Sequence, residues 1–274
     1  MTKKQKISDY SIIFHKEMEE LKSNPLITIP LFVLPIVMAM ILPIVALTPI
    51  TTMHLDDYSL DIDKLKNSSI HSPIPVESLS PKQLLIILVL NAFIPFFMVI
   101  PAVIPSVIAA HSFVGEKTTR TLEPLLATPI CERDLLIGKV LSAFIPSILA
   151  SYISFALFSI CVDFVTYPVF GTYIMPDLFW LVTVGLLTPL ICMLSIMSNV
   201  LISTKVSDVR AAQQLGSMIV VPLIIIFVLS ATRIVDINLL FLYVFAVIVA
   251  ILDFIIGFIA IKTFRRENVL IGRG

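Results

Sequence analysis

The sequence predicts an all-α integral membrane protein with six transmembrane helices and with both termini in the cytoplasm. Hydrophobic residues make up 58% of the 274 residues and charged residues only 14%, with a mean hydropathy of +1.01. Soluble domains have about 45–50% apolar and about 25% charged residues, so this chain must use lipid as its solvent. Long apolar runs and a one-sided distribution of Lys and Arg complete the prediction.

The apolar runs are each long enough to cross a bilayer, which takes about 20 residues. They are too long and too uniformly apolar for barrel strands, which alternate over about ten residues. Prolines recur within them and predict kinks, whose freed carbonyls must be satisfied by neighbouring helices or by a water-filled path. The expected spans are Leu26–Leu47, Leu84–Ala110, Leu136–Val165, Leu178–Ile202, Gln213–Ala231 and Leu239–Ile261.

The basic residues set the orientation. With the amino terminus inside, the outer segments hold only Lys64, Lys66, Lys82 and Arg233, and the other Lys and Arg residues are cytoplasmic. Because basic residues accumulate on the cytoplasmic side, both termini are expected inside, which agrees with an even number of spans. The protein is therefore expected to be a multi-pass protein of the plasma membrane.

Residues 1–25 precede the first apolar run and contain an expected helix from Ile7 to Lys22. One face gathers apolar side chains, and the charged side chains are expected to point elsewhere: the apolar set is Ile12, Ile13, Met18 and Leu21, and the charged set is Lys16, Glu17, Glu19 and Glu20. This pattern favours an amphipathic helix on the inner leaflet, the alternative being a solvated helical tail. Asn24-Pro25 ends the helix.

The transmembrane domain spans residues 26–262, and a short cytoplasmic tail, 263–274, follows it. Its longest hydrophilic stretch, about residues 48–83, is expected outside the cell. This outer loop is too short and too rich in proline to fold alone. Its acidic cluster could attract cations, but it is also what a solvated loop looks like.

No residue pattern predicts an enzyme or a cofactor on this chain. The four histidines are scattered, and no HExxH or GxSxG motif occurs. Gly138-Lys139 is not a phosphate-binding loop, because Arg133 stands where the earlier glycine must be and Val140 follows the lysine. The net charge of +0 gives no attraction to nucleic acid. The three cysteines are expected to be small buried hydrophobes.

The cytoplasmic loop at about residues 114–135 carries an ordered pattern. Thr121 can cap a short helix, Glu123 suits the positive end of its dipole, and Pro129 ends it. Leu122, Leu125 and Leu126 share one face of this helix. A helix of about two turns is not stable alone, so an exposed leucine face makes sense if it docks into another protein. The alternative on spacing alone is an ordinary solvated connector.

The same segment resembles the first cytoplasmic loop of the ATP-binding-cassette type-2 permease family. The residues that carry the resemblance are Gly115, Glu116, Lys117, Thr121 to Thr128 and Gly138-Lys139. In that family the loop holds the coupling helix, which fits into a separate ATPase. The resemblance therefore implies that Glu116, Thr121, Leu122, Glu123, Leu125, Leu126 and Pro129 contact an ATPase. It also implies that Gly115 lets the backbone turn and that Gly138 allows close helix packing.

The resemblance implies the membrane subunit of an ATP-driven exporter, which converts ATPase closure into inward-to-outward switching. It would work as a homodimer, or with a related permease, bound to two copies of an ATPase that holds ATP and Mg. Two alternatives are an ion-gradient-driven secondary transporter and a non-transporting scaffold or sensor subunit. The cargo is not determined by these residues.

Polar residues inside spans are costly in lipid and are candidates for function. The expected set is Asn91, Asp163, Asn199 and Asp253. Asp253 could line a path or bond to a neighbouring helix, and Asp163 is expected to reach interfacial water. If the family pattern holds, the second and fifth spans line an apolar path suited to amphipathic cargo. Plain helix packing is the alternative for its residues, Phe93, Phe96, Phe97, Met98, Met218 and Phe227.

Overall fold

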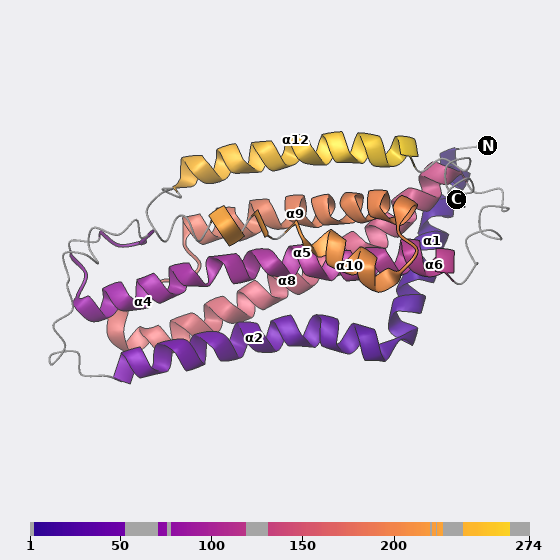
Figure 1. Ribbon diagram of the computed structural model, residues 1–274. Helices are drawn as coiled ribbons and strands as arrows, with labels where there is room; N and C mark the ends of the chain where they lie inside the picture. Colours follow the sequence, from indigo (N-terminus) through magenta and orange to yellow (C-terminus); the bar gives the residue numbers. More distant parts are fainter. Residues whose placement is uncertain are drawn as a thin grey trace.

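The computed structural model is a bundle of long helices with one shorter helix set across its end (Figure 1). It describes residues 3–52, 71–75, 78–118, 131–219, 221–222, 224–226 and 238–263. No strand occurs in these ranges. The helices are α1 (Lys3–Ser23), α2 (Pro25–Thr52), α4 (Pro81–Ala92), α5 (Ile94–Ala110), η3 (His111–Gly115), α6 (Glu116–Thr118), α8 (Glu132–Phe170), α9 (Leu178–Lys205), α10 (Val209–Ser217) and α12 (Leu239–Thr263).

Within the described residues, 5 helical segments are long and apolar enough to cross a membrane. They run over Thr28–Thr52, Pro81–Thr118, Arg133–Phe170, Leu178–Lys205 and Leu239–Thr263, and each contains most of an expected span. The remaining expected span, Gln213–Ala231, lies partly outside the described residues. The expected outer loop is shorter at both ends than about 48–83, because α2 continues to Thr52 and α4 begins at Pro81.

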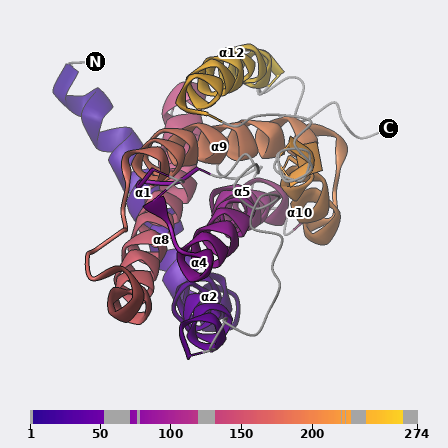
Figure 2. The ribbon, with the colours of Figure 1, turned by 90° about the vertical axis from the view of Figure 1, so that its left-hand side faces the viewer.

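The spans differ in how much of their surface the bundle covers. In its most apolar window, α9 has 61% of its residues buried, against 17% for both α2 and α12. α9 packs against α5, α8, α10 and α12, whereas α2 packs mainly on α8. Figures 1 and 2 show α2 and α12 on opposite sides of the bundle. Most of the surface of α2 and α12 is therefore left to lipid or to another protein.

An aromatic cluster fills the half of the bundle away from α1. The rings of Phe97 and Phe158 are 4.7 Å apart between centroids, and Trp180 lies 5.7 Å from Phe97. Phe93, Phe97 and Met98 are buried in this core, as the packing alternative expected. Phe96 and Met218 are exposed, at 58% and 59%, and Phe227 lies outside the described residues.

The second span is not one uniform helix. A capping box at Ser80 and Gln83 starts α4, and the helix breaks at Phe93, two residues before Pro95, which has no N–H to donate. Near its other end the backbone widens into the π-helical turn η3 and continues through α6 to Thr118. The implied turn at Gly115 is therefore wrong, because the chain remains helical there.

The amino-terminal helix α1 lies across the end of the bundle and packs against the start of α8 (Figures 1 and 2). Gly138 permits this contact, because a Cβ at that position would lie 2.7 Å from Ile13 Cβ and 3.0 Å from the carbonyl oxygen of Tyr10. The expected face of α1 is partly wrong. Ile12 is 60% exposed, while Glu17 is buried between α1 and the bundle. The reason is the ion network described below, which the helical pattern alone does not reveal.

We expect Gly138→Ala to lower the melting temperature of the protein in detergent. The new methyl group must displace the buried Ile13 side chain or the α1 backbone, and such overpacking typically costs about 1–3 kcal/mol. Gly185→Ala in α9 is the matched control, since nothing lies within 4 Å of its added Cβ. Equal melting temperatures for the two variants would contradict the close contact of α1 with α8.

Candidate functional site

The bundle holds a buried ammonium group at the end where α1 lies. Lys139, on α8, is 0% exposed, and its Nζ donates to Glu17 Oε1 at 2.9 Å and to the Ser112 carbonyl at 2.8 Å. Its Nζ is also 2.8 Å from Glu116 Oε2 and 5.5 Å from the centroid of the Phe113 ring. An ammonium group has three N–H donors, and its three hydrogen-bond acceptors here are Glu17 Oε1, the Ser112 carbonyl and the Ser112 hydroxyl, with Glu116 adding an ion pair.

A second lysine completes the cluster from the more exposed side. The ammonium of Lys16, on α1, donates to the Glu116 carboxylate and lies 3.2 Å from Glu17 Oε1 and 3.0 Å from Glu20 Oε2. We call the set Lys16, Glu17, Glu20, Ser112, Glu116 and Lys139 the ion network. It joins three separate parts of the chain: α1, the end of the second span and the start of α8.

The π-helical turn helps to place the second-span members. A π turn inserts an extra residue into the helix and is often found at functional sites. Here it precedes Glu116, and both Ser112 and Glu116 are buried. The Ser112 hydroxyl donates to Glu17 Oε2 at 2.7 Å and accepts from Lys139 Nζ at 3.0 Å. This serine therefore bridges the buried cation and the buried anion.

The surroundings of Glu17 shift its pKa. Burial by itself raises the pKa of this carboxyl group, but the Lys139 ammonium, the Ser112 hydroxyl and Lys16 outweigh burial and hold it below the ordinary value of 4.5. For Lys16, burial works against the charged form, and the Glu116, Glu17 and Glu20 carboxylates more than offset it, so its pKa is raised. Both groups are charged at neutral pH.

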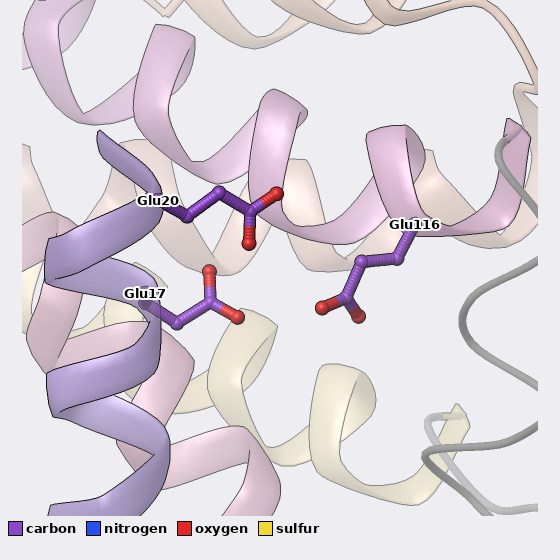
Figure 3. A group of neighbouring side chains, drawn as sticks. All are labelled: Glu17, Glu20 and Glu116. Carbon is purple, nitrogen blue, oxygen red and sulfur yellow. The ribbon is translucent and has the colours of Figure 1, made fainter. Parts of the chain in front are cut away.

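Three carboxylates, those of Glu17, Glu20 and Glu116, have oxygens within 4.8 Å of one another and could in principle hold a metal ion. Figure 3 shows Glu17 and Glu20 reaching from α1 toward Glu116. However, both Glu17 oxygens already accept hydrogen bonds from Lys139, Lys16 and Ser112. A metal ion would have to displace ammonium groups, so the cluster is better described as an ion network than as a metal centre.

Most of the residues expected to contact an ATPase lie outside the described residues: Thr121, Leu122, Glu123, Leu125, Leu126 and Pro129. Their contact with an ATPase stays a prediction, as does that of Glu116. The Glu116 carboxylate is directed inward, where it meets Lys16 and Lys139. In this structure it therefore links helices of its own chain at the point where the loop of residues 119–130 begins.

Asn199, expected as an intramembrane polar residue, joins helices. Its side-chain amide donates to Ser106 Oγ at 3.0 Å and to the Ser195 carbonyl at 2.9 Å. Ser106 in turn donates to the Gln213 carbonyl of α10 at 3.2 Å. A Cβ on Gly216 would lie 2.2 Å from the Asn199 amide nitrogen. These contacts hold α5, α9 and α10 together.

Asn91 and Asp163 lie near the opposite end of the bundle and bind backbone groups. The Asn91 amide donates to the carbonyl oxygens of His71 and Ile87, at 2.9 and 2.8 Å. Asp163 Oδ1 accepts from the backbone N–H groups of Ile174 and Met175, both at 2.9 Å. Instead of relying on water alone, Asp163 therefore orders the connection between α8 and α9.

Asp253 is the fourth expected residue and differs from the others. Both carboxyl oxygens are inaccessible on α12, and neither has a hydrogen-bond partner in the part of the chain that the structure describes. The side chain as a whole is half-buried. Neither the path-lining nor the helix-bonding prediction is decided by these contacts.

The sequence pattern did not predict four of the site residues, Lys139, Glu17, Lys16 and Ser112. It presents Lys139 as part of a failed phosphate-binding motif and of the family resemblance, and Glu17 as one of the charges expected away from the apolar face of α1. One signal was present: Lys139 lies seven residues after the start of α8 at Glu132, which is already deep for an uncompensated charge in an apolar helix.

Comparison with known families agrees with this architecture. Residues 11–262 match the model of a family described as "ABC-2 family transporter protein", so the match covers both α1 and the spans. No curated protein and no solved structure matches the chain.

We expect Lys139→Met to lower the free energy of unfolding by about 3–5 kcal/mol, because it leaves buried carboxylates without their cation. Adding Glu17→Gln should recover part of this loss, since it removes one of the stranded charges. Thermal unfolding of the single and double variants in the same detergent measures both effects. Lys205→Met, at the exposed end of α9, is the control. A single variant as stable as the unchanged protein would contradict the network.

The lowered pKa of Glu17 predicts an acid-dependent loss of stability. Its contribution is fully present above the ordinary value of 4.5 and is lost as the pH falls below that value toward the folded-state pKa. Melting temperatures measured from neutral pH downward should therefore fall less steeply for Glu17→Gln than for the unchanged protein. Glu19→Gln, on the exposed side of α1, should leave the slope as it was.

Proposed function

The chain belongs to the ABC-2 family of transporter proteins, and on that premise we propose that it is the transmembrane permease subunit of an ATP-driven exporter. It is a multi-pass membrane protein with at least 5 helices able to span a bilayer. Members of this family are membrane subunits that normally work with a separate ATPase. On the proposed role, ATP and Mg are bound by that partner, and this chain supplies the path.

The ion network is the observation that supports a coupling role. In the chain, residues 119–130 stand between α6 and Cys131, which precedes α8. Glu116 lies three residues before residue 119, and Lys139 lies nine residues after residue 130. Their charged groups are 2.8 Å apart. A force applied to the loop would therefore reach the second and third spans together, because the ion pair holds their ends as one unit.

The same ion network would carry the movement to α1 and the first span. Glu17 and Lys16 fasten α1 to both loop-flanking helices. α1 is followed directly by α2, and Thr28 Oγ1 donates to the Leu21 carbonyl across the junction at 2.5 Å. On this proposal, two ATPase copies close on ATP, press the coupling helices formed by residues 121–129, and shift the three spans toward the outward-facing state.

A second copy of the permease is part of the proposal. α2 and α12 leave most of their apolar surface uncovered by this chain, so a paired bundle has two candidate faces. The side on which α1 and the coupling loop lie is proposed to be cytoplasmic, as the excess of Lys and Arg there favours. The plasma membrane is the proposed location, and export is the proposed direction.

We expect the double variant Leu122→Asp with Leu126→Asp to lose its ATP-hydrolysing partner. Two carboxylates on the apolar face of a docking helix cannot be desolvated without great cost. The measurement is Mg-dependent ATP hydrolysis in the complex purified from native membranes by a tag on this chain. Ser207→Asp, in the exposed loop between α9 and α10, is the control for an added carboxylate outside the docking face and should keep the activity.

Two results would contradict the proposed function. One is a double variant that keeps both the ATPase and transport. The other is a purified unchanged chain that moves its solute with no ATP-hydrolysing companion present.

A further inference from the structure

Two neighbouring cavities that differ in polar content lie along the side of α2 and α5. The first, about 310 Å³, is at the end of the bundle near α1 and is lined by polar groups that include Glu17, Glu20 and His111. The second, about 390 Å³, is lined along its length by apolar side chains of α2 and α5 and by Phe158. Glu17 and Glu20 line the first cavity, and Figure 3 shows both side chains extending from α1.

The two cavities adjoin. Leu31 lines both. On α5, Ile108 lines the polar cavity and Ile104, one turn further into the span, lines the apolar one. On α2, Thr28 lines the polar cavity and Leu34 the apolar one. A molecule with a polar head and a long apolar tail could therefore occupy both without crossing a helix.

The charge balance selects the sign of the head group. Among the described residues, neither Lys nor Arg lines the polar cavity. Its charged lining consists of the carboxylates of Glu17 and Glu20. The charges that face the cavity are therefore negative. Glu20 has the most accessible of these carboxylates, at 60% side-chain exposure, and can turn toward a ligand.

We propose that the joined cavities bind a cationic amphiphile, with an ammonium head beside Glu20 and an alkyl tail between α2 and α5. Both sides of this pairing follow from the lining: carboxylate and hydroxyl acceptors meet the ammonium N–H groups, and the apolar groove removes the tail from water. The inference that such a molecule is cargo rests on the proposed function. Its binding to the joined cavities does not depend on that function.

The only tryptophan of the chain provides a reporter. Trp180 lies behind the groove wall, with its ring centroid 5.5 Å from that of Phe158 and 5.7 Å from that of Phe97, and both phenylalanines line the groove. A dodecylamine brominated near the end of its chain should quench Trp180 fluorescence when it binds. The full chain in lipid nanodiscs is titrated with this amine and, separately, with the equally brominated alcohol and alkyl sulfate.

The amine should quench at lower concentration than the alcohol, and the sulfate should be the weakest ligand. Glu20→Gln should weaken amine binding about fivefold, the scale of one partly exposed ion pair, and leave the alcohol unchanged. Glu19→Gln is the matched control, because Glu19 lies on the same helix and does not line the cavity. Leu34→Phe should narrow the groove and weaken both amine and alcohol, whereas Leu252→Phe on α12 should weaken neither.

The proposal is overturned if the amine and alcohol quench alike, or if Glu20→Gln and Glu19→Gln behave the same, because quenching would then report only partition into lipid. Binding is measured without ATP or any ATPase. If the unchanged chain proves to have no ATPase partner, the proposed function is wrong, but the binding result is unaffected. If the titration fails, the binding proposal is wrong, but the proposed coupling to an ATPase is unaffected.

Discussion

A buried ammonium group governs the end of this bundle. A lysine nitrogen that is wholly removed from water is tolerated only if each N–H finds an acceptor and the charge is balanced. For Lys139 the acceptors come from α1 and from the end of the second span. Neither helix can move away without exposing or stranding the charge. The position of α1 across the bundle, the burial of Glu17 and the inward direction of Glu116 all follow from this one requirement.

The ion network also explains why the helical pattern of apolar residues predicted the buried face of α1 only in part. A carboxylate on a helix in contact with water and lipid is expected to face water, and Glu17 would do so if α1 were alone. With Lys139 on α8 beneath it, burial becomes favourable, and Ile12 is turned outward instead. Gly138 then lets the two backbones approach closely enough for the charges to meet. A glycine one residue before the lysine is thus part of the same contact.

Two of the polar residues inside the spans also depend on partners from other parts of the chain. Asn199 and Asp163 meet backbone or side-chain partners on neighbouring elements, as lipid-embedded polar groups must. Their roles are to hold elements of the bundle together, and the residues proposed for ligand binding lie elsewhere, at the junction of α1, α2 and α5. In the described residues, the carboxylates that line the first cavity and the apolar groove beside it are neighbours in space that belong to distant parts of the chain.

The sequence by itself determined that lipid is the solvent of this protein and that helices are in contact with the lipid. Apolar runs of span length and the amino-terminal helix could be read locally, because the demand for internal hydrogen bonds in lipid leaves a helix as the one conformation for such a run. Tertiary structure decided which charges meet. Lys139 and Glu17 are separated by 122 positions, and their pairing depends on the packing of α1 on α8, which no periodicity encodes. Since a buried charge is stable only in the presence of its partner, the site exists in the folded chain alone.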